Sequence, residues 1–144
     1  MSMRKPEQVL WDKIRDIMAG QWRADRVENK ILQGMPDVYF SVSSGLTGWL
    51  ELKVIKQFPK GDHHTVRIPH YTPYQANWHW THRDFGTKSW IVVLVEEEVF
   101  FFAARMALAL FEGMSVRDFR KSARIVELKK MDNLKIVDAL LQAR

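Results

Sequence analysis

Residues 34–55 read GMPDVYFSVSSGLTGWLELKVI, and this stretch decides how the chain folds. Its part VYFSV (38–42) alternates apolar and more polar residues, which predicts a strand with one buried face. A Ser-Ser-Gly turn follows, and WLELKVI (49–55) predicts a second strand. Side chains alternate between the two faces of a sheet. One face of the second strand should therefore carry Trp49, Glu51, Lys53 and Ile55, and the other Leu50, Leu52 and Val54.

Helices are expected on both sides of this pair of strands. Residues 6–19 have proline in the first turn and apolar residues at helical spacing, and this helix should end near Gly20. Thr72-Pro73-Tyr74-Gln75 combines an N-cap residue, a proline and a glutamine three residues after the cap. It predicts a helix that continues to about Phe85 and is stopped by Gly86.

The rest of the chain completes a mixed pattern. Residues 23–29 predict a weakly patterned first strand, and residues 56–70 a polar, basic loop. Ser89–Val95 and Val99–Ala104 predict an antiparallel hairpin, with Glu96-Glu97-Glu98 as its solvated turn rather than a catalytic group. Further helices are expected over Met106–Glu112, from a Ser115-x-x-Asp118 start, and at a last helix with Leu134, Val137, Leu140 and Leu141 on one face. This order predicts an α/β fold in which helices flank a mixed sheet.

Composition limits the class of protein. A chain of 144 residues with 47% hydrophobic residues suits one ordinary domain. It contains no cysteine, so disulfides and thiolate metal sites are excluded. No stretch approaches the roughly 18 apolar residues of a membrane span, and we expect a soluble, intracellular protein. The net charge of +5 is typical of proteins that bind polyanions, and by itself it leaves DNA, RNA and anionic membranes open.

Three residues of the opening stretch have the chemistry of a metal site. Asp37 begins one strand, and Glu51 and Lys53 lie on one face of the next, about 7 Å apart along it. Two converging carboxylates are the hard oxygen ligands that Mg²⁺ prefers. A neighbouring lysine can orient a water molecule or stabilise charge on a phosphoryl group. Taken alone, however, such residues are usually an ordinary turn and a solvated strand face.

The combination of three segments is more specific. Gly34-Met35-Pro36-Asp37, then Trp49-Leu50-Glu51-Leu52-Lys53, then Thr72-Pro73-Tyr74-Gln75 resembles the VRR-NUC branch of the PD-(D/E)XK nucleases. That branch includes small phage and bacterial proteins similar to Holliday junction resolvases. The resemblance covers roughly residues 7–95 and assigns nothing to residues 105–144. It implies a restriction-endonuclease-like core in αβββαβ order and a single nuclease domain over residues 1–144.

The resemblance also implies roles for individual residues. Asp37, Glu51 and the backbone carbonyl of Leu52 would bind Mg²⁺, with Mn²⁺ as a substitute, and Lys53 would serve catalysis. Gln75 would point at the active site, although Thr72-x-x-Gln75 is also a capping box. The family carries a further acid on its first helix, for which Glu7 is the candidate and Glu28 the rival. An acid in a first helical turn is also favoured by the helix dipole alone.

The implied activity is that of a Mg²⁺-dependent, structure-specific DNA endonuclease, similar to a Holliday junction resolvase, in the cytoplasm of a bacterium or a phage-infected cell. The alternatives are a nucleic-acid-binding module without turnover and an RNA-processing nuclease. Branched or four-way DNA is the expected partner. We also expect a homodimer that uses helix 73–85 or the apolar face of the last helix. The predicted phosphate contacts are Lys56, Lys60 and Arg67.

Two other groups of residues have simpler explanations. The five histidines, His63, His64, His70, His79 and His82, form no strong ligand pattern, and a polar loop and a helix face account for them. Trp78 and Trp80 could stack on bases, but on a helix they are better explained as core and interface residues.

Overall fold

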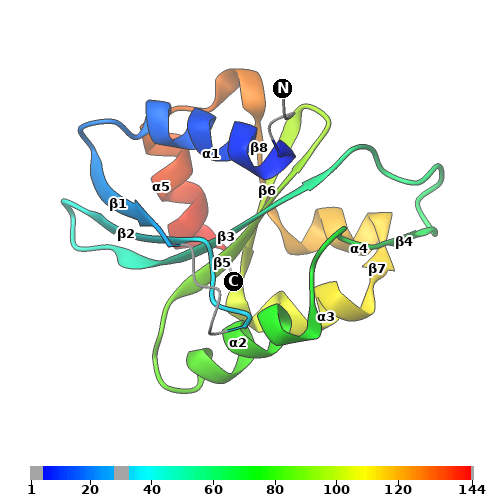
Figure 1. Cartoon of the computed structure of the whole chain (residues 1–144). Coiled ribbons are helices and arrows are strands. Elements are labelled where there is room, and N and C mark those ends of the chain that lie inside the picture. Colours follow the sequence, from blue (N-terminus) through cyan, green and yellow to red (C-terminus); the bar gives the residue numbers. More distant parts are fainter. Residues whose placement is uncertain (1–4, 28–32, 144) are drawn as a thin grey trace.

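A sheet with helices on both faces forms the centre of the structure, a computed structural model that describes residues 5–27 and 33–143 (Figure 1). The strands are β1 (Trp22–Arg26), β2 (Val38–Val42), β3 (Thr47–Ile55), β4 (Thr65–Val66), β5 (Ser89–Val95), β6 (Glu98–Ala103), β7 (Met114–Ser115) and β8 (Arg124–Glu127). Within the described residues, six strands form one sheet in the order β1-β2-β3-β5-β6-β8. Its neighbours β3 and β5 are parallel and the other pairs antiparallel. Strands β4 and β7 pair separately.

The helices divide between the two faces of this sheet. They are α1 (Pro6–Ile17), α2 (Pro73–Arg83), α3 (Ala107–Glu112), α4 (Val116–Ser122) and α5 (Asn133–Gln142), with short 3₁₀ turns at Ala104–Met106 and Leu128–Lys130. Helices α1 and α5 pack on one face, and α2, α3 and α4 pack on the other (Figure 1). The predicted fold class, a mixed sheet flanked by helices with α1, β1, β2, β3, α2 and β5 in that order, is confirmed.

Strand β3 separates two apolar cores, as its alternation predicts. Leu50 and Leu52 belong to the core under α1 and α5, whereas Ile55 belongs to the core under α2, α3 and α4. Glu51 and Lys53 are on the face of Ile55, and they are only 0% and 4% exposed. The predicted division of β3 between two faces is confirmed, but its polar face is buried rather than solvated.

Most predicted elements have the expected positions, with ends shifted by a few residues. Helix α1 ends at Ile17 and α2 at Arg83, in each case two residues before the predicted end. Strand β1 overlaps the predicted strand over residues 23–29, of which residues 28 and 29 lie outside the described residues. Ser115 caps α4 by accepting a hydrogen bond from the Asp118 backbone N–H, as predicted.

Three details of the rest of the chain differ from the sequence expectations. The loop predicted at 56–70 contains β4, because Val66 and Ile68 are buried against α3 and α4. Strand β8 was not predicted, since it is a short edge strand with largely exposed side chains. The hairpin turn is shorter than predicted because Glu98 already pairs with Val95.

The buried face of α5 agrees with the predicted one at Leu140 and Val137 and differs from it at Leu134 and Leu141. Leu134 and Leu141 are 75% and 62% exposed, and the buried residues are Ile136, Ala139 and Leu140. Leu134 and Leu141 are seven residues apart and lie on one side of the helix. The side that packs against the sheet is the one that carries Ile136 and Ala139. Among the described residues, no helix is both long and apolar enough to span a membrane.

Candidate active site

The pairing of β2 with β3 brings Asp37 and Glu51 together. The last pair of this antiparallel ladder is Val38 with Leu50, and continuing the register by one residue sets Asp37 opposite Glu51. Directly opposite residues of an antiparallel pair have side chains on the same face. Asp37 Oδ2 accepts a hydrogen bond from the Leu52 backbone N–H at 2.9 Å. The two carboxyl groups also hydrogen-bond to each other.

Both carboxyl groups are in an environment that opposes their charge. Burial and the neighbouring charge of Glu51 raise the pKa of Asp37 from 3.8 to about 7. Burial raises the pKa of Glu51 from 4.5 to about 7, although its hydrogen bond with Asp37 and the charge of Lys53 oppose this shift. The pair therefore retains a proton near neutral pH, and a bound cation could replace that proton.

Lys53 lies two residues after Glu51 on β3, on the same face of the sheet. Its Nζ donates a hydrogen bond to the His70 carbonyl at 2.8 Å and lies 6.0 Å from the centre of the Tyr71 ring. His70 has a positive φ of 60°, a conformation that is uncommon outside glycine. The segment before α2 thus holds the lysine, while the remaining donors of its ammonium group can interact with a ligand.

Helix α2 approaches the two acids at its first turn. The Gln75 side chain accepts a hydrogen bond from the Thr72 N–H at 3.0 Å through Oε1, and its Nε2 is 3.4 Å from Glu51 Oε2. The side-chain amide of Gln75 therefore serves in both ways: its oxygen completes the capping box, and its nitrogen contacts Glu51. Gly34 permits the close approach, because a Cβ there would lie 2.3 Å from the Tyr74 carbonyl oxygen.

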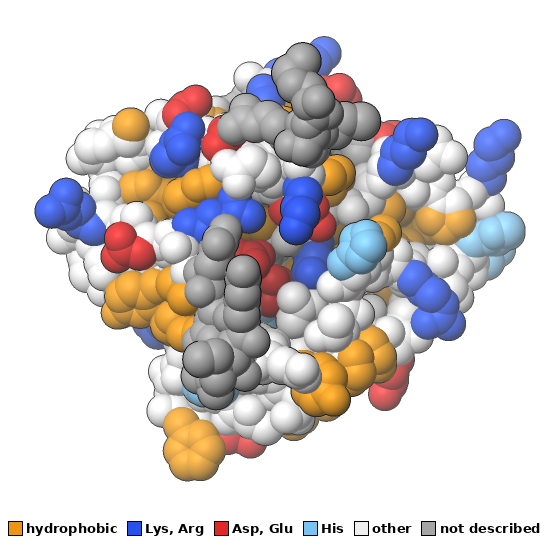
Figure 2. Space-filling view, viewed as in Figure 1, with side chains coloured by type: hydrophobic (Ala, Val, Ile, Leu, Met, Phe, Trp, Pro, Cys, Tyr) orange, Lys and Arg blue, Asp and Glu red, His pale blue; other side chains and the backbone are white. Residues whose placement is uncertain are grey.

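A cleft of about 740 Å³ opens beside Asp37 and Lys53, and basic side chains surround it. Figure 2 shows acidic and basic side chains gathered in the middle of this face. The lining residues are Lys5, Pro6, Glu7, Arg26, Asp37, Leu52, Lys53, Val54, Lys56, Pro69 and His70.

The cleft separates the predicted DNA contacts into two groups. Lys56 lines it, whereas Lys60 and Arg67 are exposed and not part of the lining. Arg67 instead donates a hydrogen bond to the Glu112 carbonyl at 3.1 Å. Arg26 and Lys5 also line the cleft, and the sequence pattern did not predict them as phosphate contacts. The pairing of Arg26 with Val38 could have revealed its place, since it sets this arginine beside the turn that carries Asp37.

Glu7 takes the position expected of the acid on the first helix. It is half-buried in the first turn of α1, lines the cleft, and its charge raises the pKa of Glu51. Its rival Glu28 lies outside the described residues. Within residues 5–27 and 33–143, no three His, Cys, Asp or Glu side chains are close enough to form a metal site by themselves. Glu7 is thus near Asp37 and Glu51 without completing a set of three side-chain ligands.

The donor set suits a hard divalent cation. It contains the half-buried carboxyl group of Asp37 and the buried one of Glu51, whose Oε1 has no hydrogen-bond partner. The N–H of Leu52 points toward Asp37, so its carbonyl, on the same side of an extended strand, points toward that edge as well. Two carboxylates and a carbonyl, completed by water and phosphate, are ligands that Mg²⁺ accepts.

Among the histidines, His79 stands apart from the polar roles expected of all five. Its side chain is completely buried, and Nδ1 is 2.7 Å from the Ser89 hydroxyl. Its Nε2 lies 3.7 Å from Glu51 Oε1. Burial lowers the pKa of His79 to about 3. The spacing of Gln75 and His79, one helical turn apart, is the sequence signal that could have identified it.

The tryptophans of α2 pack against neighbouring side chains. Trp78 is half-buried, stacks on His82 with ring centres 3.8 Å apart, and meets the edge of Trp49. Trp80 lies under the guanidinium group of Arg83 at 4.7 Å. These contacts agree with core and surface packing rather than with open rings that stack on bases.

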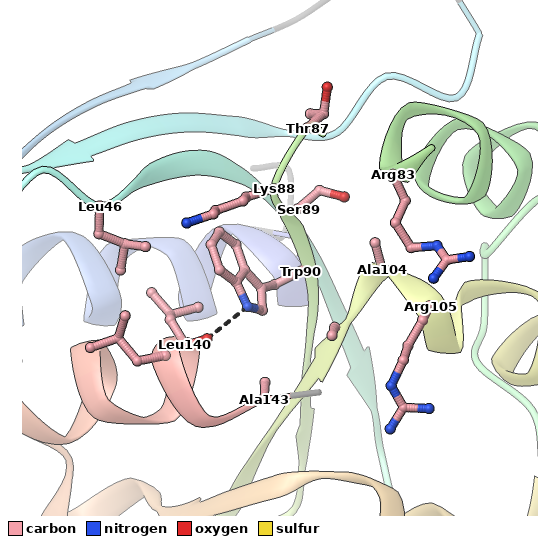
Figure 3. A pocket seen from close by; sticks show the side chains of 12 residues that line it. Leu46, Arg83, Thr87, Lys88, Ser89, Trp90, Ala104, Arg105, Leu140 and Ala143 are labelled. Carbon is pink, nitrogen blue, oxygen red and sulfur yellow. Dashed lines mark hydrogen bonds between the residues drawn. The ribbon is translucent and has the colours of Figure 1, made fainter. Parts of the chain in front are cut away.

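A second hollow, of about 360 Å³, lies near the start of β5 (Figure 3). Its Trp90 donates a hydrogen bond from Nε1 to the Leu140 carbonyl at 3.0 Å, and Leu46 lies across from it. Arg83 and Arg105 stand at one side (Figure 3). None of the predicted site residues lines this hollow, so the acidic chemistry belongs to the first cleft.

The fold is similar to that of a solved structure. No protein-family model matches the chain, and no curated protein matches it. Among solved structures, it is similar to Archaeoglobus fulgidus Hjc, a Holliday junction resolvase from an archaeal hyperthermophile. The sequence identity is 14%, the match covers 77% of this chain and 96% of that chain, and the TM-score is 0.48.

Proposed function

We propose that this chain is a Mg²⁺-dependent, structure-specific DNA endonuclease of the Holliday junction resolvase type, formed by one nuclease domain over residues 1–144. The observation that carries the proposal is the carboxyl pair of half-buried Asp37 and buried Glu51, with Lys53 beside it, where Asp37 and Lys53 line a basic cleft. The three matched sequence segments support assignment to the VRR-NUC branch. We place the activity in the cytoplasm of a bacterium or of a phage-infected cell.

Asp37, Glu51 and the carbonyl of Leu52 would hold Mg²⁺, or Mn²⁺ in its place. When bound, the ion would polarise the phosphate and lower the pKa of a water molecule. Lys53, fixed by the His70 carbonyl, would donate to the attacking water or to a phosphoryl oxygen. Gln75 would hold the carboxylate of Glu51.

Binding of DNA would depend on the basic side chains around the cleft. Lys5, Arg26 and Lys56 can contact phosphates close to the acids. Lys60 and Arg67 are exposed further away and would contact DNA that extends beyond the cleft. A module that only binds nucleic acid would gain nothing from placing two carboxylates beside these cations, because negative charge opposes phosphate binding.

The test is cleavage of labelled linear, flap and four-way DNA with Mg²⁺, with Mn²⁺ and with chelator. Asp37→Asn and Glu51→Gln should abolish cutting and leave DNA binding largely intact. Asp118→Asn and Glu97→Gln make the same atomic changes at exposed positions and should cut like the wild type. Cutting at the wild-type rate by the Asp37 variant would reject the site. Binding without cutting would favour a binding module, and cleavage of RNA alone an RNA-processing enzyme.

We further propose a two-fold homodimer, in which two sites nick opposing strands of a branched DNA. Exposed apolar side chains on the two helices expected to form the interface support it: Tyr74 and Phe85 at the ends of α2, and Leu134 and Leu141 on α5. Light scattering of the wild type and of a Leu134→Ser, Leu141→Ser variant measures the assembly. A monomer at micromolar concentration that nicks flaps but ignores four-way junctions would contradict the resolvase assignment.

A further inference from the structure

Two buried side-chain atoms face each other without a hydrogen-bond partner. They are Glu51 Oε1 and His79 Nε2, they are 3.7 Å apart, and no other side-chain atom of the described residues is both buried and unpaired. Both side chains are completely buried. An unpaired polar group in the interior is costly, and such groups are rare in folded proteins. This pair therefore needs a physical explanation.

The contact of His79 with Ser89 allows the hydrogen of a neutral ring to be on Nε2, because a hydroxyl can donate to Nδ1. Nδ1 is 2.7 Å from the hydroxyl of Ser89, which is itself buried. If the hydroxyl donates to Nδ1, the hydrogen of a neutral ring is on Nε2, which points toward Glu51. A carboxylate oxygen can only accept, so a donor at Nε2 is what Glu51 Oε1 lacks.

Helix α2 reaches Glu51 with two side chains. Gln75 Nε2 is 3.4 Å from Oε2, and His79 Nε2 is 3.7 Å from Oε1. Gln75 and His79 are four residues apart and therefore lie on one face of the helix, one turn from each other. Each oxygen of Glu51 thus has one donor group from α2 beside it. The lone pairs that these donors do not use remain available on the side of Asp37.

We propose that His79 is a positioning residue for Glu51, which donates from Nε2 to Oε1 and, together with Gln75, fixes the orientation of the carboxylate. The 3.7 Å separation exceeds a normal N–H···O distance. A turn of the carboxylate about its soft terminal torsion shortens it. Such contacts often tighten only when the site is loaded. The consequence for metal binding rests on the proposed function, whereas the hydrogen bond itself does not.

Two substitutions separate this role from simple packing. In His79→Asn, an amide atom occupies the region of Nδ1, so the contact with Ser89 can persist while the donor to Glu51 is lost. In His79→Gln, the longer side chain can place an NH₂ group near the position of Nε2 and restore that donor. Both variants are first compared with the wild type by thermal melting, so that loss of folding is recognised.

The first measurement needs neither metal nor activity. Nitrogen NMR of histidine-labelled wild-type protein, free of metal, should show His79 with its hydrogen on Nε2. That resonance should move in the Glu51→Gln variant and stay unchanged in the exposed Glu97→Gln variant. A hydrogen on Nδ1, or a resonance insensitive to Glu51, would overturn the proposal even if no variant of His79 folds.

The second measurement is calorimetric titration with Mn²⁺. Loss of an outer-shell partner typically weakens metal binding by roughly 10- to 100-fold. We expect His79→Asn to raise the Kd for Mn²⁺ by about 10-fold or more, and His79→Gln to remain near the wild type. Equal affinity of wild type and His79→Asn would refute the positioning role. If the wild type neither binds Mn²⁺ nor cuts DNA, the proposed function fails, and the NMR result alone decides the hydrogen bond.

Discussion

Glu51→Gln should stabilise the metal-free protein at pH 8. The folded-state pKa of Glu51 is raised from 4.5 to about 7, mainly by burial. Between these values the folded state retains a proton that the unfolded state has released. The free energy of unfolding therefore falls as pH rises through this window, and the penalty is complete above pH 7. Glutamine has the same shape and no charge, so it avoids the penalty.

The size of the effect follows from the shift. One pKa unit corresponds to about 1.4 kcal/mol, so the rise at Glu51 from 4.5 to about 7 corresponds to about 3.5 kcal/mol at most. Asp37 shares the proton with Glu51, and this coupling reduces the gain from one substitution. A domain of this size shifts its Tm by about 2–4 °C per kcal/mol. We therefore expect Glu51→Gln to raise Tm by roughly 5–10 °C at pH 8 and by much less at pH 5.

Thermal denaturation in EDTA at both pH values measures the effect. Glu97→Gln is the control, because it makes the same change at an exposed position and should leave Tm unchanged. Added Mg²⁺ should raise the Tm of the wild type and not that of Glu51→Gln, since a ligand stabilises the state that binds it. If Glu51→Gln melts at or below the wild type at pH 8 in EDTA, the carboxylate is not in an environment that opposes its charge.

Three further predictions concern the surroundings of the acids. Lys53→Met should reduce the rate of cleavage by at least about 100-fold, as loss of an electrostatic donor does, and calorimetry should still show Mn²⁺ binding. Arg26→Ala should weaken DNA binding and lower its salt dependence by about one counterion, measured by anisotropy, and Lys60→Ala, outside the lining of the cleft, should have a smaller effect on a short duplex. Gly34→Ala should destabilise the fold by roughly 2 kcal/mol or more in urea, because φ is +88° and a Cβ would clash with the α2 backbone. Gly20→Ala, at φ +77° with open space around it, isolates the cost of the backbone conformation alone.

The segment 34–55 was predictable because its geometry is local. A short turn joins β2 and β3, so the hydrophobic alternation and the turn together determine the register. That register sets Asp37 opposite Glu51, and the alternation leaves Lys53 on the same face. The sequence did not show that this face would be buried, because α2 covers it from a position more than 20 residues further along the chain.

Other features depend on contacts between distant segments. Strand β4 exists through its pairing with β7, some 50 residues away, and its own two residues are too short a pattern to predict a strand. The burial of His79 was missed for a similar reason, since only its position one helical turn after Gln75 distinguishes it from the exposed histidines. Arg26 reaches the cleft only through the pairing of β1 with β2. Residue types indicated the acids, whereas tertiary packing determined what surrounds them.

The energetically unfavourable features of this fold lie at Asp37 and Glu51. Elsewhere, Thr72, Ser115 and Asp132 cap their helices with hydrogen bonds, as stable structure requires. At this site, by contrast, half-buried Asp37 and buried Glu51 have raised pKa values, and an oxygen of Glu51 has no partner. Packing for stability alone would exchange such groups for apolar ones. A bound cation would instead remove the repulsion and satisfy the free oxygen at once, which is why the unfavourable arrangement is itself evidence for a metal site.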